Sequence, residues 1–160
     1  MSQKYLIVSI LLSTIAFSTG CASDADADTN SATPVATTIV SGDYTITGIP
    51  DSRKIEVYED QVTFNESLYT FIRPIAEETI DFSLNQVVLF SLGGRSSGGY
   101  SIEVSGVEDM NDYVKVSVLY SFPGSDCVVT PSETSPYLFI KIDTTKEIIF
   151  EESIENLVCN

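Results

Sequence analysis

Residues 87–104 read VVLFSLGGRSSGGYSIEV, and this stretch decides the expected fold. It begins with Val87–Phe90, a continuous apolar run of the kind found in strands that are buried on both faces. It ends with Ile102 and Val104 alternating with polar residues, which is the period-two pattern of a strand with one buried face. A glycine-rich turn separates the two runs. The stretch therefore predicts two strands joined by a short loop.

Further strands are predicted on both sides of this stretch. Apolar or alternating runs bounded by turn residues occur at 54–58, 114–118, 137–142 and 148–150. Spacings of roughly 10–13 residues between strands are typical of small all-β domains. The predicted fold class is mainly β, an antiparallel β-sandwich or a partly open barrel formed by residues 39–160. Residues 143–146 are predicted to form a hairpin turn between the last two strands.

One short helix, at about residues 65–73, is expected to interrupt the strands. Asn65 is a good N-cap residue, and Leu68, Phe71 and Ile72 share one face at helical spacing. Pro74 bounds the helix on its far side, because the residue before a proline disfavours helical geometry.

The first twenty residues read as a targeting segment. Lys4 precedes an uncharged apolar run, Tyr5–Phe17, which is shorter than the roughly 20 residues of a membrane-spanning helix. The small residues 18–20 before Cys21 resemble the bacterial lipobox. That resemblance implies cleavage before Cys21 and lipidation of this cysteine, which places the protein in the bacterial cell envelope, in the outer membrane of a diderm host. The alternative is an ordinary signal peptide that is cut nearby.

Residues 21–38 are expected to form a disordered acidic tether. The segment is rich in Ala, Asp, Ser and Thr and has almost no large apolar side chains, so it cannot offset the entropy of ordering. Asp24, Asp26 and Asp28 imitate the start of a calcium loop. The required glycine and glutamate are replaced by Thr29 and Val35, and we expect no metal site.

The charge balance excludes several classes of function. The chain carries 8 Lys and Arg against 23 Asp and Glu, which gives a net charge of −15. Such a surface repels nucleic acid, whose binding requires clustered cations. The absence of histidine excludes His-based triads and His-ligated zinc.

An enzyme is the weakest of the functions considered. Without histidine, catalysis would depend on carboxylates, and the paired candidates 77–78, 108–109 and 151–152 are adjacent in the sequence. Adjacent residues on a strand point to opposite faces, so these carboxylates are expected to be solvated charges. We therefore expect no enzyme activity, no cofactor and no small-molecule substrate.

The remaining two cysteines predict a disulfide bond. If Cys21 is lipidated, Cys127 and Cys159 remain in an oxidising compartment, where they are expected to pair. The alternative is two free or separately buried thiols.

The glycine-rich loop is the predicted partner-binding site. Adjacent glycines permit positive φ angles and close approach of the backbone, and they weaken the fold unless something requires them. A tight turn explains them, and so does a loop shaped to contact a partner. The best anchor side chains for a partner are Arg95 and Tyr100, although Tyr100 also suits the core. The predicted site comprises Gly93, Gly94, Arg95, Ser96, Ser97, Gly98, Gly99 and Tyr100.

With its flanks, residues 81–142, this loop resembles the C-terminal domain of the protease complex subunit PrcB family. The matching positions are Ile80–Ser83, Gly93, Arg95, Ser97–Ile102, Pro123, Cys127–Thr130 and Pro136–Tyr137. Ser96 departs from the family's usual proline. The resemblance implies a non-enzymatic, lipid-anchored accessory protein that binds and stabilises an envelope protease complex.

A second resemblance implies a different function. The Ser96–Tyr100 sequence is similar to the partner-binding loop of chagasin-like cysteine-protease inhibitors, which have an immunoglobulin-like fold. That loop enters the protease cleft in the inhibitor family. The alternative function is therefore inhibition of a protease by the same loop.

Overall fold

A computed structural model of the chain describes residues 33–48, 52–73 and 79–159. The apolar N-terminal run, Cys21 and most of the predicted tether lie outside the described residues, and so do Pro74 and the carboxylates 77–78. Within the described ranges, no helix has both the length and the apolar character needed to cross a bilayer.

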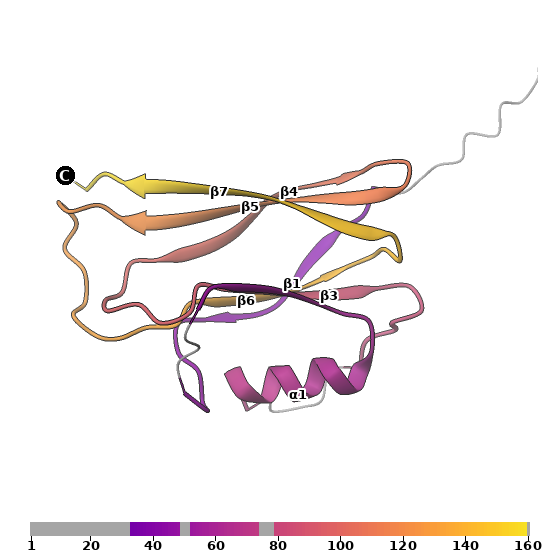
Figure 1. Cartoon of the computed structure of the whole chain (residues 1–160), viewed down its shortest axis with the longest axis horizontal. Coiled ribbons are helices and arrows are strands. Elements are labelled where there is room, and N and C mark those ends of the chain that lie inside the picture. Colours follow the sequence, from indigo (N-terminus) through magenta and orange to yellow (C-terminus); the bar gives the residue numbers. More distant parts are fainter. Residues whose placement is uncertain (1–32, 49–51, 74–78, 160) are drawn as a thin grey trace, which may run out of the picture. The chain divides into compact units, whose positions relative to one another are not determined.

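The described chain folds into two β-sheets and one helix. The four-stranded sheet has the order β1-β6-β3-β2, and the three-stranded sheet has the order β4-β5-β7. Figure 1 shows the two sheets stacked, with the helix on the outer face of the four-stranded sheet. The prediction of a mainly β sandwich is confirmed, and no barrel closes. The elements are β1 (Ala36–Gly42), β2 (Lys54–Tyr58), α1 (Gln61–Phe71), β3 (Gln86–Ser91), β4 (Ser101–Asp109), β5 (Tyr113–Pro123), β6 (Tyr137–Ile142) and β7 (Glu147–Leu157).

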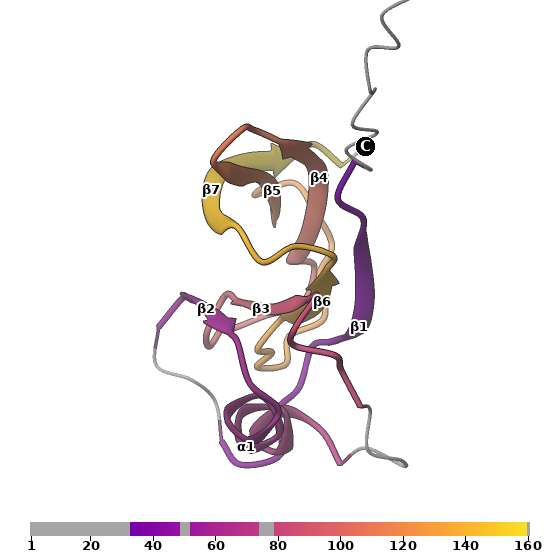
Figure 2. The ribbon, with the colours of Figure 1, turned by 90° about the vertical axis from the view of Figure 1, so that its right-hand side faces the viewer.

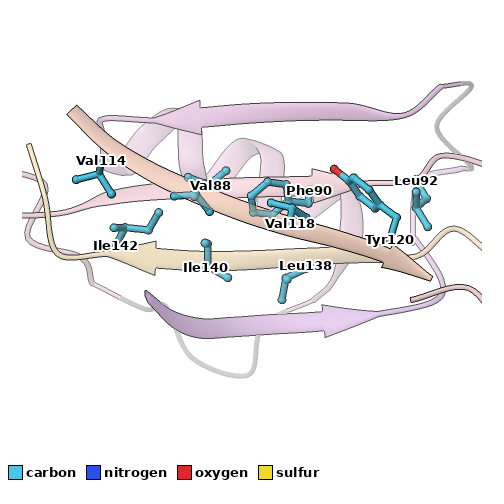
Figure 3. Close-up of a cluster of buried hydrophobic side chains, with 10 residues drawn as sticks. Val88, Phe90, Leu92, Val114, Val118, Tyr120, Leu138, Ile140 and Ile142 are labelled. Atoms are coloured by element: carbon cyan, nitrogen blue, oxygen red, sulfur yellow. The ribbon is translucent and has the colours of Figure 1, made fainter. Parts of the chain in front are cut away.

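Strand β3 lies at the centre of the fold, and all its residues are buried. Val88 and Phe90 belong to the apolar cluster between the two sheets, which Figure 3 shows. Val87 and Leu89 point the other way and belong to the cluster beneath α1. The uninterrupted apolar run thus serves two cores, which is why it does not alternate with polar residues.

The helix begins earlier than the sequence predicted. Asp60 is the N-cap, and its carboxylate accepts hydrogen bonds from the backbone N–H groups of Val62 and Thr63. The predicted cap, Asn65, instead lies inside the helix and accepts a hydrogen bond from Gln61. The earlier start brings Phe64 onto the apolar face of the helix, where it is fully buried.

The predicted hairpin at 143–146 is wrong. These residues carry the chain from β6 in one sheet to β7 in the other, and β7 pairs with β5 in the parallel direction. The reason is that β6 already lies between β1 and β3, so both of its edges are occupied. Strand β7 pairs instead with β5, whose full length it matches from Tyr113 to Pro123.

The first strand begins inside the segment predicted to be a tether. Ala36 starts β1, pairs with Ile142 of β6 and packs against the core between the sheets. The backbone N–H of Asp143 also donates a hydrogen bond to the carbonyl oxygen of Val35. These contacts order residues 36–38, whose small side chains gave no apolar signal in the sequence.

Replacing Asp60 with alanine is expected to lower the urea midpoint of unfolding at neutral pH, because the N–H groups of Thr63 and Val62 lose their acceptor. The same hydrogen bonds lower the pKa of Asp60. A carboxyl whose folded-state pKa is lowered stabilises the fold at neutral pH, and this contribution is lost as the pH falls through that pKa.

The urea midpoints of the wild type and Asp60→Ala should therefore differ at neutral pH and converge in acid. Circular dichroism measures both transitions, and Glu59→Ala is the matched control, because it removes the neighbouring exposed carboxylate. A midpoint of Asp60→Ala equal to that of the wild type at neutral pH would contradict the assignment of the cap.

Candidate functional site

The predicted partner loop begins with a residue that has to be glycine. Gly93 follows the buried Leu92 and has a φ angle of 70°, in the left-handed region. A Cβ atom at this position would lie 2.7 Å from the carbonyl carbon of Ser52. Both the backbone conformation and the close approach of the segment before β2 therefore exclude a side chain.

The loop is held along its length by a second segment, residues 124–136, which connects β5 to β6. Arg95 and Thr134 exchange two backbone hydrogen bonds, with N···O distances of 2.8 and 2.9 Å. The N–H of Gly98 donates to the carbonyl of Thr130 at 3.0 Å, and the Thr134 hydroxyl donates to the carbonyl of Ser97 at 2.8 Å. The loop therefore has a fixed backbone conformation.

The two side chains predicted to anchor a partner, Arg95 and Tyr100, are half-buried and make contacts within the fold. The Arg95 guanidinium lies 5.4 Å from the ring centroids of both Tyr100 and Phe122, and it donates a hydrogen bond to the carbonyl of Leu92. Tyr100 meets Phe122 edge-on at 5.3 Å and packs against the core between the sheets. Arg95 joins the loop to this aromatic pair through cation–π contacts.

Other residues of the predicted loop remain accessible. Gly94, Ser96 and Gly99 are exposed, whereas Gly93 is buried and Ser97 and Gly98 are half-buried. Gly99 has a φ angle of 91° and packs closely against Val129 and Pro123. The loop thus offers mainly backbone and one hydroxyl group to an approaching molecule.

The predicted disulfide bond joins Cys127 to Cys159, with the two Cα atoms 4.9 Å apart. Because β5 and β7 run parallel, their C-terminal ends lie side by side, and the bond links the segments that follow them. The N–H of Gly124 donates to the carbonyl of Leu157, and the N–H of Cys159 donates to the Asp126 carboxylate. The end of the chain is thereby fixed beside the 124–136 segment.

Two apolar side chains beside this disulfide were not singled out from the sequence. Val128, which follows Cys127, is 103% exposed, and Val158, which precedes Cys159, is 81% exposed. Val129, next to Val128, contacts the Gly99 position of the loop. Burial can be predicted from the sequence only where hydrophobic residues recur with a regular period. These two valines lie outside such runs, so the sequence did not predict their exposure.

The adjacent carboxylates of Glu151 and Glu152 form ion pairs with different cations. Glu151 pairs with Lys115 at 3.4 Å, whereas its neighbour Glu152 pairs with Arg53 at 3.2 Å. Opposite orientation of neighbouring residues on a strand produces this division. In the part of the chain that the structure describes, no group of three acidic or thiol side chains is arranged to hold a metal ion.

Two buried tyrosines, Tyr120 and Tyr137, keep their protons at neutral pH. Burial and the Glu152 carboxylate raise the pKa of Tyr120, and burial and the Asp43 carboxylate raise the pKa of Tyr137. Both phenols are therefore neutral groups and do not supply a nucleophilic oxygen at physiological pH.

Comparison with known proteins identifies the domain that carries the loop. Residues 86–143 match the family model described as PrcB C-terminal. The match runs from the start of β3 to the residue after β6, and it includes the loop, β4, β5 and the 124–136 segment. The comparisons with curated proteins and with solved structures gave no match. The chain therefore contains a PrcB-like domain, as the loop and its flanks predicted.

Replacing two glycines of the loop with alanine is expected to destabilise the domain at one position and to have little effect at the other. Gly93→Ala should lower the free energy of unfolding by about 1–3 kcal/mol, because the new Cβ meets backbone at 2.7 Å and φ is positive. Gly98→Ala should change it little, since its Cβ would lie 3.7 Å from Thr130. Urea unfolding measures both variants, and equal effects would contradict the described packing at Gly93.

Loss of the disulfide bond is expected to destabilise the domain by about 3 kcal/mol, because the bond closes a loop with a sequence separation of 32 residues. Urea unfolding of the wild type should shift when dithiothreitol is added. The double variant Cys127→Ala/Cys159→Ala should resemble the reduced wild type and should not respond to the reductant. A wild type that is insensitive to dithiothreitol would contradict the contribution of the bond.

Proposed function

Since residues 86–143 form a PrcB-like domain, we propose that this chain is a non-enzymatic, lipid-anchored envelope protein that binds and stabilises a protease or protease complex. The observation that carries the proposal is the family match itself. It covers the 93–100 loop together with the strands and the connecting segment that hold the loop.

The rigidity of the loop supports its role in binding. Backbone hydrogen bonds from Arg95 and Gly98 hold it against the 124–136 segment before any partner arrives. A preorganised loop loses little conformational entropy when it binds, so more of the contact energy contributes to affinity. The exposed backbone at Gly94 and Gly99 suits contacts with a partner's main chain.

The N-terminal sequence supports the anchor. Lipidation of Cys21 would place the membrane at one end of residues 22–33, which span at most about 40 Å when fully extended. The full chain has a net charge of −15, and this negative charge keeps the protein surface away from anionic lipid headgroups. The acyl chains therefore supply the membrane affinity.

The test is affinity capture of the tagged full-length protein from mildly solubilised native envelopes, followed by mass spectrometry. The wild type should recover a protease, and Ser96→Arg should lose it, because the new side chain stands on the exposed part of the loop. Thr145→Arg is the matched control, since Thr145 is exposed in the connection between β6 and β7, beyond the other end of β3. Arg95 is unsuitable for this purpose because its side chain holds the loop to Phe122.

Three further results bear on the proposal. Added protein should prolong the active lifetime of the captured protease, whereas stoichiometric loss of protease activity would support the inhibitor alternative. Cys21→Ala should release the protein from the membrane fraction. Recovery of the same protease by Ser96→Arg, or of no protease by the wild type, would contradict the role of the loop.

A further inference from the structure

The two sheets differ in width, and one strand is left without a strand facing it. Strand β7 covers the β3 and β2 side of the wider sheet, because Phe150 meets Phe90 at 5.6 Å and Glu152 pairs with Arg53, just before β2. Strand β4 lies towards β6 and β1 on the other side, as Figure 2 shows. The wider sheet thus has one strand more than the sheet stacked on it, and β1 lies at its edge beyond β4 (Figure 2).

The uncovered strip is a groove between β1 and β4, with a volume of about 540 Å³. Leu138 and Ile140 of β6 form its apolar floor. A second hollow of about 200 Å³ shares Ser41 and Ile102 with it and extends it to Tyr100, the last residue of the loop. We call the two hollows together the β1–β4 groove. Its walls are formed by Ala36, Thr38 and Ser41 of β1 and by Ile102, Glu103, Val104, Ser105, Gly106 and Val107 of β4.

Both walls of the groove are edge strands. Strands β1 and β4 are terminal in their sheets, so the backbone groups along their outer edges have no strand neighbour among the described residues. Each strand contains one bulge, between Thr38 and Val40 in β1 and between Val104 and Gly106 in β4. A bulge shifts the alternation of side chains by one residue, so the residues of β1 that line the groove change from even positions, Ala36 and Thr38, to an odd position, Ser41.

The charge around the groove favours a basic occupant. Glu103 and Asp43 line it, and no lysine or arginine among the described residues does so. Glu103 also forms no ion pair with any described residue. The predicted tether of this chain carries Asp24, Asp26 and Asp28, and a second copy of the chain has the same net charge of −15. The negative charge therefore disfavours either of them as the occupant of the groove.

We propose that the β1–β4 groove binds an extended segment of the protease partner that carries apolar residues at alternate positions and Lys or Arg between them. The segment pairs with the free edge of β4 as a fourth strand, and its apolar side chains cover Leu138 and Ile140. The nine residues of β4 set its length. This inference rests on the proposed function and deepens it by naming the kind of partner segment.

The probe is a fluorescent nine-residue peptide, Lys-Val-Thr-Val-Lys-Val-Thr-Val-Lys, titrated with the full-length protein and followed by anisotropy. Thr38→Trp fills the groove and should weaken binding by at least about tenfold. Thr37→Trp is the matched control, because Thr37 is also exposed and its side chain points to the opposite face of β1. It should leave the dissociation constant unchanged within about twofold.

The charge is tested separately, with variants at exposed glutamates that do not depend on packing. Glu103→Lys should weaken binding of the basic peptide several-fold, and Glu59→Lys should not. A peptide with Glu in place of each Lys should bind at least about tenfold more weakly to the wild type. Hydrogen exchange should slow at the β4 amides when the basic peptide is bound, because the new strand pairs with them.

Equal binding of the basic peptide by Thr38→Trp and Thr37→Trp would overturn the proposal. The proposal would also be overturned if the wild type bound the acidic peptide as tightly as the basic one. A dimer in analytical ultracentrifugation that Thr38→Trp abolishes would assign the groove to a second copy and also overturn it. If Thr38→Trp still captures the protease while Ser96→Arg does not, the groove proposal fails and the proposed function stands. If the groove binds the peptide but the wild type recovers no protease, the groove remains a peptide-binding site and the proposed function is overturned.

Discussion

The structure depends on the pairing of β3 with β6 at the centre of the four-stranded sheet. Both faces of this pair are buried, one against the three-stranded sheet and the other against α1. Phe139 of β6 contacts the ring of Phe64 from the helix at 6.0 Å, and Phe90 of β3 contacts Phe150 from the opposite sheet at 5.6 Å. The helix and the three-stranded sheet therefore both pack on these two strands.

The sequence predicted the strands well because burial imposes a period on each of them, but it did not predict their partners. Ile148 and Phe150 bury the same face whether β7 pairs with β6 or with β5, so the local pattern is identical in both arrangements. Strand β7 cannot pair with β6 because β1 and β3 already occupy both edges of β6, and these strands are distant in the sequence. The start of the helix was missed for a similar reason, since burial of Phe64 against Phe139 favours the earlier cap at Asp60.

The candidate site was predictable in its backbone and not in its side chains. Adjacent glycines indicated a turn with positive φ, which Gly93 and Gly99 adopt. Whether Arg95 points to solvent or to the fold is decided by Phe122, which comes from another strand and has no local relation to the loop. A residue type that is common at interfaces therefore serves here to fix the loop in position.

The groove and the loop meet at Tyr100, and this junction gives the two surfaces a common physical basis. Tyr100 closes the loop through its contact with Phe122, and it also lines the end of the groove beside Asp43. An added strand along β4 would therefore end next to the exposed backbone of Gly99. One extended segment and the loop would then form a continuous interface. Because both edges of the groove and the loop are already ordered, most of the entropy cost would fall on the partner's segment.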